Sequence, residues 1–580
     1  MNTLPDKTIV ERLNTLSAER KKVLALPPAE ALDRILEASQ PAALVHSMPE
    51  EDLYLLIQEI GHEDALPILA LASIRQWEFL VDMEVWNRDR INLEAVTKWM
   101  NLLLKADSNR LIKWVVEEKV DFLEYYLFKN LQVVVRQHDQ DPSDFGDGFI
   151  TYDDTFYFRI MENPLPAPST PDASVPFADA QRKAVLSEIV KRLSDYDQLK
   201  YQGLLLEASG LIPAEVEEEN YRLRNVRLAE RGFQAFDDAI GIYQRLSPDD
   251  LKGKDRKYTL PTGSDAPLAV PYYATQLPQS ENLFAQTLSV IDQGEMVMQI
   301  QTEFAILCNQ IISADQKRVS AKGALGTIIK KGCGYLTIGL ESIAGASKDD
   351  KSHRYAALIQ KHLLADIFRV GYGRALELKW QAENWRKKSW GYQTGLPLSF
   401  YGEEWVGVLG GLLIKKPLYF DNYQTGVLYR EFEKLDEVKQ TQAGLNEMMA
   451  FDRLLSMMEI ANERLTRHPL LTYKNLLLTL WVRNETGLSR ELDPVGPETF
   501  GPFFEKLWVP DQIPRRIKTS SKTSFLNWLS NRTGLKPFEI SERVGPTLEN
   551  LFGEIESELG PVAAQDLDPR YVHLFLLQEG

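Results

Sequence analysis

The sequence predicts a mainly α-helical protein, with an N-terminal superhelical stack of short helices followed by irregular multi-helix domains and a minor β element. Three observations lead to this prediction. Short leucine-rich segments near the N-terminus place apolar residues three and four positions apart, which is the spacing of one helix face. Helical patterns continue through most of the later sequence. Only the stretch Ile150–Met161 alternates in the way a strand or hairpin arm does.

The first segments form an approximate repeat. Pro28 begins the stretch PAEALDRIL, which aligns with PEEDLYLLI beginning at Pro49. Proline is tolerated in the first turn of a helix because its missing N–H would have no partner there, and the acidic residues that follow suit the helix dipole. Since helices this short are unstable alone, they must bury their apolar faces against neighbours. We therefore expect a helical-repeat domain over residues 1–138.

Longer helical patterns complete this domain before the pattern breaks. We expect helices over Glu94–Lys105, Arg110–Glu118 and Phe122–Arg136. The stretch Asn163–Pro176 is rich in proline, and proline clusters between periodic segments are typical of loops. Residues 139–180 are therefore predicted to be a loop and strand linker.

Helical patterns return after this linker and predict a helical domain over 181–280, a central helical domain over 281–470 and a C-terminal helical region over 471–580. Lys252–Gln279 contains several prolines and glycines and is expected to be a loop-rich break. His353–Trp385 can form one long helix or two. Pro397–Pro417 is expected to be irregular, and Tyr429–Thr466 helical.

Composition restricts the classes of function. The 580 residues are 44% hydrophobic and 26% charged, as in ordinary globular proteins, and the net charge is −17. An acidic surface repels phosphate backbones and anionic lipid, so nucleic acid is not an expected partner. The two cysteines, Cys308 and Cys333, form no Cys-x-x-Cys unit. They are interpreted as buried structural thiols, and their scarcity fits the reducing cytoplasm.

The sequence predicts neither a membrane span nor an ordinary export signal. The N-terminus is polar and amphipathic, without the apolar core of a signal peptide. The longest apolar runs, such as Ala65–Ala72 and Val406–Ile414, are much shorter than the roughly 20 residues that a membrane helix needs.

Two resemblances add to these expectations. Residues 24–69, LALPPAEALDRILEASQPAALVHSMPEEDLYLLIQEIGHEDALPIL, resemble the intracellular N-domain of bacterial magnesium transporters and the repeats of the flagellar rotor switch protein. That resemblance implies a right-handed stack of short helices used in sensing or assembly. The blocks RLAERGFQAFDDAIGIYQRLSP and HLLADIFRVGYGRALELKWQAENW resemble an uncharacterised family of bacterial helical proteins, which implies little about function.

The first candidate ligand-binding cluster is basic and lies in the helix expected over Ala214–Arg231: Arg222, Arg224, Arg227 and Arg231. Glu218 and Arg222 are spaced to pair across one helical turn. Arg227 and Arg231 are also four residues apart, so their like charges repel unless an acidic group lies opposite. That group is either a phosphate-bearing ligand or the carboxylates of another helix, and both alternatives remain open.

The second candidate cluster is aromatic and contains four tryptophans: Trp380, Trp385, Trp390 and Trp405. Basic residues at 386–388 lie among them. Large aromatic side chains around a loop can line a ligand pocket or a protein-binding groove. They can equally anchor an irregular segment to the core.

Other patterns are weaker. Arg515, Arg516, Lys518 and Lys522 precede Phe525 and Trp528, and this combination fits either single-stranded nucleic acid or a solvated loop.

His362 and Asp366 have the spacing of a helical pair. Glycines within 323–332 and at 371 and 373 are interpreted as sites of close helix packing. No pattern predicts a catalytic residue, a metal site or a cofactor.

These observations predict a cytoplasmic bacterial scaffold or regulatory protein without catalytic activity. We expect it to bind a protein partner through the groove of its repeat stack, and altering Leu53, Leu56 or the exposed face of the repeats tests that binding. The alternative is a sensor or enzyme for a phosphate-bearing small ligand, with its site at the arginine helix or the tryptophan-rich segment.

Overall fold

The computed structural model describes residues 7–138, 140–162, 179–210, 212–251, 270–277, 282–291, 294–317, 322–345, 351–465, 468 and 470–578. These residues are predominantly helical, with small antiparallel sheets, which confirms the predicted fold class.

The chain forms two compact units. Unit 1 comprises Met1–Ile242, Lys254–Gly332 and Lys348–Ala365, and unit 2 comprises Tyr243–Gly253, Cys333–Ser347 and Asp366–Gly580. Since the chain passes between them several times, no single cut along the sequence separates the two units.

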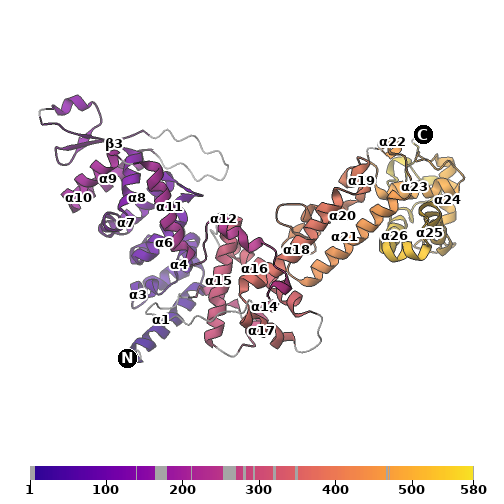
Figure 1. Cartoon of the computed structure of the whole chain (residues 1–580), viewed down its shortest axis with the longest axis horizontal. Coiled ribbons are helices and arrows are strands. Elements are labelled where there is room, and N and C mark those ends of the chain that lie inside the picture. Colours follow the sequence, from indigo (N-terminus) through magenta and orange to yellow (C-terminus); the bar gives the residue numbers. More distant parts are fainter. Residues whose placement is uncertain are drawn as a thin grey trace. The chain divides into compact units, whose positions relative to one another are not determined.

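Unit 1 begins with the N-terminal stack, whose six helices are labelled in part in Figure 1: α1 (Lys7–Ala25), α2 (Pro28–Leu36), α3 (Pro41–His46), α4 (Glu50–Ile60), α5 (Leu66–Leu71) and α6 (Ile74–Glu84). The two repeat segments form α2 and α4 as predicted. Pro28 is the first residue of α2, and Pro49 directly precedes α4. Leu53 and Leu56 are buried. Altering them therefore tests the stability of the stack as well, and the expectation that partner binding depends on them stays a prediction.

The stack continues into α7 (Leu93–Glu117), which joins two of the predicted helices. Asp107 leaves the helical conformation there, and its carboxylate accepts a 3.0 Å hydrogen bond from the Arg110 backbone N–H. The Arg110 guanidinium lies 4.0 Å from the centre of the Trp77 ring and donates to the backbone oxygens of Ala70 and Ala72. The second half of α7 thereby satisfies carbonyls at the end of α5.

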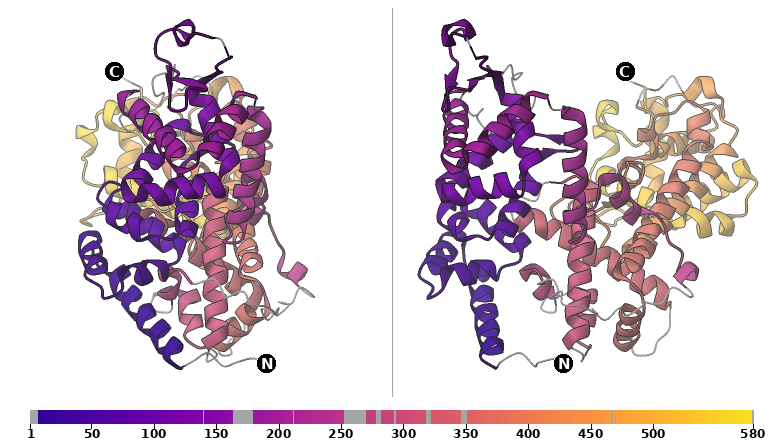
Figure 2. Two further views of the ribbon diagram at one scale, coloured as in Figure 1. Left: turned by 90° about the vertical axis from the view of Figure 1, so that its left-hand side faces the viewer. Right: turned by 60° about the vertical axis from the view of Figure 1, so that its left-hand side comes forward.

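A three-stranded sheet follows. The helix expected over Phe122–Arg136 ends early, because α8 (Val120–Asn130) is followed directly by β3 (Leu131–Val135). Three consecutive valines favour a strand, and β5 (Phe156–Ile160) pairs with β3 along its whole length. The order is β3–β5–β4, with β4 at Ile150–Thr151, so the expected hairpin arm at 150–161 is confirmed. The connection carrying a 3₁₀ turn (Pro142–Phe145) projects beyond the helices of unit 1 (Figures 1 and 2).

The remaining elements of unit 1 are a two-stranded hairpin and a set of helices: β1 (Trp86–Asn87), β2 (Arg90–Ile91), α9 (Asp179–Tyr196), α10 (Gln198–Gly210), α11 (Pro213–Ala229), α12 (Phe236–Ala239), α13 (Tyr272–Thr275), α14 (Leu283–Leu288), α15 (Gly294–Asp315) and α17 (Lys351–Lys361). The predicted linker at Asn163–Pro176 lies outside the described residues. Most of the expected break at Lys252–Gln279 also lies outside them, and its described part contains α13.

Two of the boundaries between the units fall inside helices α16 (Lys322–Ala344) and α18 (Leu364–Arg386). His353–Trp385 is thus two helices, α17 and most of α18. Within unit 2, α16 and α18 cross at glycines. A Cβ atom on Gly371 would lie 1.9 Å from the Tyr335 backbone oxygen, and one on Gly339 would lie 2.1 Å from that of Ile367. The packing interpretation of Gly371 is confirmed.

Unit 2 also contains α19 (Trp390–Gln393), α20 (Glu403–Leu412), β6 (Tyr419–Phe420), β7 (Tyr429–Arg430), α21 (Leu435–Ser456), α22 (Asn462–Leu465), α23 (Tyr473–Glu485), α24 (Pro497–Leu507), α25 (Thr519–Thr533) and α26 (Pro537–Leu559). The helical expectation for Tyr429–Thr466 is confirmed over α21 and α22 and fails at its first residues, and the irregular structure expected for Pro397–Pro417 is wrong. Pro397–Pro417 contains α20, whose glycines allow β6 and β7 to pack closely against it. Tyr429 begins a strand because it pairs with Phe420 in a hairpin.

Helices α23–α26 lie together in Figure 1, and each contributes a ring to one buried aromatic core. The Trp481 ring lies edge-on to Phe503, Phe525 and Phe552, with ring centres 5.0, 5.2 and 6.5 Å away. Cys308 and Cys333 are both buried, as the sequence predicts. In the part of the chain that the structure describes, no helix has the length and apolar character needed to cross a lipid bilayer.

Candidate functional site: a groove along helix α11

Helix α11 presents two faces of different character. Arg224, Arg227 and Arg231 recur at the three- and four-residue spacing of one face, with Arg231 just past the helix end. Glu218, Arg222 and Val226 are each four residues apart and therefore share another face. The first face contacts the N-terminal stack and α15, and the second lines an open groove.

Arg227 and Arg224 join α11 to the end of α6. The Arg227 guanidinium binds the Asp82 carboxylate with two hydrogen bonds of 2.8 Å, and its Nε lies 3.2 Å from Glu78 Oε1. Arg224 donates from Nε to the Asp82 backbone oxygen at 2.7 Å, and its guanidinium lies 5.6 Å from the centre of the Trp86 ring. Burial raises the pKa of Asp82, and the hydrogen bonds and charge of Arg227 oppose that rise.

Arg231 joins the end of α11 to the first turn of α4. It lies 2.5 Å from a Glu50 carboxylate oxygen and 2.9 Å from one of Glu51, and all three side chains are about nine-tenths buried. Asn309 of α15 donates from Nδ2 to the Arg231 backbone oxygen at 2.6 Å. Burial raises the pKa of Glu51, and the Arg231 charge opposes that rise. The Arg231 guanidinium thus balances Glu51 and shares the Glu50 carboxylate with Arg75, whose Nε lies 3.1 Å from Glu50 Oε1.

Asp52 extends this acidic turn to α13. Both of its carboxylate oxygens accept the Tyr272 backbone N–H, at 3.0 and 2.9 Å. Burial raises the pKa of Asp52 to about 8, and the neighbouring Glu51 charge adds to the rise, whereas the Tyr272 hydrogen bond and the Arg20 charge oppose it. Asp52 therefore holds the N-terminus of α13 against the N-terminal stack.

Glu217 fixes the first half of α11. Its buried carboxylate accepts hydrogen bonds from Arg90 Nη1 at 2.6 Å, the Ile91 backbone N–H at 2.9 Å and the Tyr125 hydroxyl at 3.1 Å. These donors come from β2 and α8. Buried contacts therefore position α11 along its length, and a groove on its outer side is held in shape before any partner binds.

The sequence left two alternatives for the group opposite the arginines, a phosphate-bearing ligand or carboxylates of another helix. The structure places carboxylates of other helices opposite Arg227 and Arg231. Arg222 is exposed and pairs with Glu219 at 2.6 and 2.8 Å, whereas the sequence suggested Glu218. The assignment of the four arginines to a ligand stays a prediction. Their contacts favour the internal ion-pair interpretation.

The α11 groove is an open depression of about 710 Å³. Its lining residues come from α11 and from the turn and short helix that follow: Glu215, Glu218, Glu219, Tyr221, Arg222, Asn225, Val226, Ala229, Gln234, Ala235 and Asp238. Four of them carry a carboxylate and one a guanidinium. Val226 is 54% exposed, so the groove also offers apolar surface to a partner.

The tryptophan-rich segment packs mainly within unit 2. Trp385 lies edge-on to Tyr401, with ring centres 5.4 Å apart, and Trp405 stacks on Tyr473 at 5.1 Å. Trp390 lies 5.9 Å from Phe400. These contacts favour the anchoring interpretation, whereas Trp380 is 43% exposed. The assignment of the four tryptophans to a ligand also stays a prediction.

Asp452 of α21 organises this segment. Its carboxylate accepts the backbone N–H groups of Trp390 and Gly391 at 2.9 and 3.2 Å and the Tyr401 hydroxyl at 2.6 Å. Burial raises the pKa of Tyr401, and the Asp452 charge adds to the rise. The buried carboxylate thus stabilises the short helix α19 and keeps the Tyr401 hydroxyl protonated.

The basic patch near residue 515 is engaged in contacts of unit 2. Arg516 pairs with Glu556 at 2.5 Å, and Lys522 pairs with Glu549 at 2.6 Å. The aromatic residues expected beside them, Phe525 and Trp528, are buried. Bases cannot stack on rings that lie in the core, so the structure gives the nucleic-acid interpretation no support.

Two smaller expectations also have structural outcomes. The break between α17 and α18 lies between His362 and Asp366, so their spacing is not that of one helix and the expected helical pair is wrong. Among the described residues, no group of three or more His, Cys, Asp and Glu side chains is arranged to hold a metal ion.

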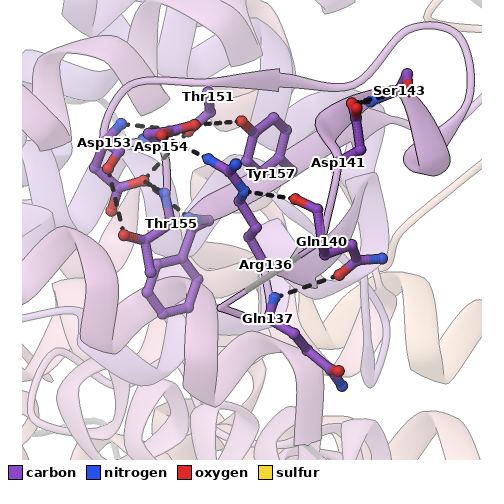
Figure 3. Close-up of polar contacts among 11 residues, drawn as sticks. Arg136, Gln137, Gln140, Asp141, Ser143, Thr151, Asp153, Asp154, Thr155 and Tyr157 are labelled. Carbon is purple, nitrogen blue, oxygen red and sulfur yellow. Dashed lines mark hydrogen bonds and ion pairs between the residues drawn. The ribbon is translucent and has the colours of Figure 1, made fainter.

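The connections between the strands of the three-stranded sheet have polar contacts of their own (Figure 3). Arg136 binds Asp154 at 2.6 Å and donates from Nε to the Gln140 backbone oxygen at 2.9 Å. Tyr157 donates to Asp154 at 2.5 Å, and this bond lowers the pKa of the Asp154 carboxyl. Asp153 accepts the backbone N–H of Thr155 at 3.0 Å. The carboxylates of Asp153 and Asp154 therefore stabilise the turns of these connections.

Of the residues that line the α11 groove, the sequence identified Arg222 as a candidate ligand-binding residue and Glu218 only as its expected ion-pair partner. The signal available was an apolar residue, Val226, within a charged helix face. It could not be interpreted from the sequence alone, because the groove also requires residues 234–238, whose position depends on the turn after α11.

A comparison with protein families gives a match over nearly the whole chain. The model of a family of unknown function, DUF6178, matches residues 7–578. No curated protein and no solved structure matches the chain. The resemblance of residues 24–69 to magnesium-transporter and rotor-switch domains therefore stays a prediction.

Proposed function

This chain belongs to the family of unknown function DUF6178, and because that description assigns no activity, we propose a function from the geometry: a non-catalytic scaffold or regulatory protein that binds a protein partner along α11. The observation that carries the proposal is the open, partly apolar α11 groove, whose supporting helix is fixed by buried ion pairs. Preformed surfaces with exposed apolar groups are typical of protein-binding sites.

The rest of the molecule supports the same role. The bacterial cytoplasm is the proposed location, because cysteine is scarce and the charge is strongly acidic. The resemblance of residues 24–69 to helical stacks used in sensing or assembly points in the same direction. The alternative, a phosphate-bearing ligand at the arginine helix, has less support because Arg224, Arg227 and Arg231 already contact acidic or carbonyl oxygens.

The test is site-specific photo-crosslinking in the full chain. One variant carries a photoreactive amino acid at Val226, and a matched variant carries it at Phe538, an apolar side chain in α26 that is 63% exposed. We expect irradiation in native lysate to give one protein adduct of defined mass at position 226, identified by mass spectrometry, that is absent at position 538.

Two outcomes oppose the proposal. The first is the absence of a protein adduct at position 226, or the same adducts at both positions. The second is a saturable rise in melting temperature with inorganic phosphate or nucleotides that Arg222→Ala abolishes, which supports the small-ligand alternative. Arg222 is suited to this control because its exposed side chain contributes little to folding.

A further inference from the structure

The α11 groove combines a carboxylate-rich lining with exposed apolar surface. Resting on the proposed scaffold function, we propose that it holds a basic amphipathic helix from another protein.

Charge is the first argument. Glu215, Glu218 and Glu219 come from α11 and Asp238 from the short helix after it, so carboxylates enter the groove from both elements. Among the described residues that line the groove, the one cation is Arg222, which already pairs with Glu219 at 2.6 and 2.8 Å. A lysine- or arginine-bearing segment complements this lining, and the net charge of −17 steers such a segment toward the protein. The same carboxylates repel an anionic ligand.

The apolar part of the lining specifies an amphipathic occupant. Val226 is 54% exposed and lies one turn from Arg222 on the same helix face, with Ala229 beyond it. The Tyr221 ring lines the groove as well and packs against Trp86, with ring centres 5.6 Å apart. A purely charged segment would leave these groups exposed to water, whereas one with an apolar stripe covers them.

Backbone hydrogen bonding favours a helix over an extended strand. The groove is lined by helices and a turn, and neither offers a sheet edge to a bound strand. A strand would therefore desolvate its N–H and C=O groups without compensation, whereas a helix satisfies them internally. From Glu215 to Ala229 the groove follows α11 for about 21 Å, which corresponds to roughly 14 residues of a bound helix.

The groove is also rigid. Gly232 forms the turn between α11 and the residues that complete the lining, with φ at +84°. A Cβ atom there would lie 2.7 Å from the Ile306 backbone oxygen, so the turn packs directly against α15. Because the walls are held in place, a partner loses little binding energy to ordering the groove.

The test uses two labelled 18-residue peptides and the full chain. The first peptide has leucines on one helical face and lysines beside them, and the second replaces each lysine with glutamate. We expect saturable binding of the first peptide in fluorescence anisotropy and at least tenfold weaker binding of the second.

Variants locate the site. Glu215→Lys/Glu218→Lys is expected to weaken binding of the lysine peptide about tenfold, because two exposed attractions become repulsions. Glu505→Lys/Glu558→Lys makes the same change in net charge on exposed helix positions of unit 2, and we expect less than a twofold effect. Val226→Gln removes apolar surface without changing charge and should weaken binding several-fold. Unchanged melting temperatures confirm that each variant folds.

Equal binding of the two peptides overturns the inference, as does an equal effect of the groove variants and the unit 2 variants. If the peptides fail to bind while position 226 still gives its protein adduct, this inference fails and the scaffold proposal stands. If no adduct forms, the scaffold proposal itself fails.

Discussion

Asp52 lies buried at the start of α4, and both of its oxygens accept the Tyr272 N–H. Burial raises its pKa from an ordinary value near 3.8 to about 8. Between these values the folded state keeps a proton that the unfolded state has lost. The free energy of unfolding therefore falls as pH rises through this window and levels off above pH 8.

Asp52→Asn should remove this contribution. Asparagine keeps an acceptor oxygen for the Tyr272 N–H but does not titrate. We expect the pH dependence of stability between about pH 4 and 8 to become less steep by up to about 1.4 kcal/mol per pH unit, and the variant to be more stable than the native chain at pH 8. Denaturant unfolding at several pH values measures this slope. The control Glu505→Gln, on an exposed face of α24, should leave it unchanged, and an unchanged slope for Asp52→Asn would show that Asp52 does not titrate in this window.

Arg231 balances the buried carboxylates of Glu50 and Glu51. Arg231→Met keeps much of the side-chain volume but leaves Glu51 without its guanidinium and Glu50 with only the exposed Arg75, which should destabilise unit 1 by about 3–5 kcal/mol. Arg222→Met, an exposed arginine of α11, should cost less than about 1 kcal/mol. Equal losses in chemical denaturation would contradict the buried ion pair as a main support of α11.

The spacing of the arginines showed in advance that Arg227 and Arg231 need acidic groups opposite. It could not identify Asp82 or Glu51 as those groups, because they lie more than a hundred residues away in the sequence. Which of several distant carboxylates meets an arginine depends on tertiary packing.

At the scale of elements, α16 and α18 cross with their backbones in near contact at Gly339 and Gly371. Gly371→Ala would place a Cβ atom 1.9 Å from the Tyr335 backbone oxygen. The two helices would have to move apart to relieve this clash. We expect a loss of about 1–3 kcal/mol or more in unfolding free energy.

The matched control for this crossing is Gly444→Ala in the interior of α21. Apart from the nearby backbone of α21 itself, no atom of the described residues lies within 4 Å of its added Cβ, so alanine should stabilise the protein by about 0.5–1 kcal/mol through its helix propensity. Opposite signs for the two substitutions, measured by melting temperature, are the expected result. Two stabilising substitutions would show that α16 and α18 do not approach this closely.

Helices and strands could be predicted where the local sequence pattern favours the same structure that the tertiary contacts require. The segments at Pro28 and Pro49 form helices because proline, acidic first turns and apolar spacing all favour them. Residues 131–135 were predicted as part of a helix, yet they form β3, because the valines gain a hydrogen-bonding partner in β5 that the local sequence does not show. Similarly, the glycines of α20 suggested an irregular segment, whereas they serve the close packing of β6 and β7.

At the scale of the whole molecule, the mainly α-helical class followed from the prevalence of helical spacing, and the structure confirms it. The predicted five-part division of the chain stays a prediction. The structure divides into two compact units, which is fewer than the five predicted parts. Residues 243–253 and 333–347 belong to unit 2 although unit 1 residues flank them. A reading along the chain cannot assign such short stretches, because their assignment depends on contacts with distant residues.

Each unit has its own buried aromatic core, and we therefore expect two transitions in calorimetric unfolding. Trp99→Ala in unit 1 should lower one transition, and Trp481→Ala in unit 2 should lower the other, each by about 3–5 kcal/mol in stability, because both tryptophans are almost completely buried. A single transition that both variants shift equally would contradict independent cores.

The two faces of α11 should also leave different marks on the evolution of the family. A change at Arg227 or Arg231 is tolerated only with a compensating change at Asp82 or Glu51 of the same chain. A change at Glu218 or Val226 is instead compensated in another gene, that of the partner. In aligned relatives, substitutions at Arg227 and Arg231 should therefore occur together with substitutions at Asp82 and Glu51. Substitutions at Glu218 and Val226 should instead occur together with substitutions in the partner protein.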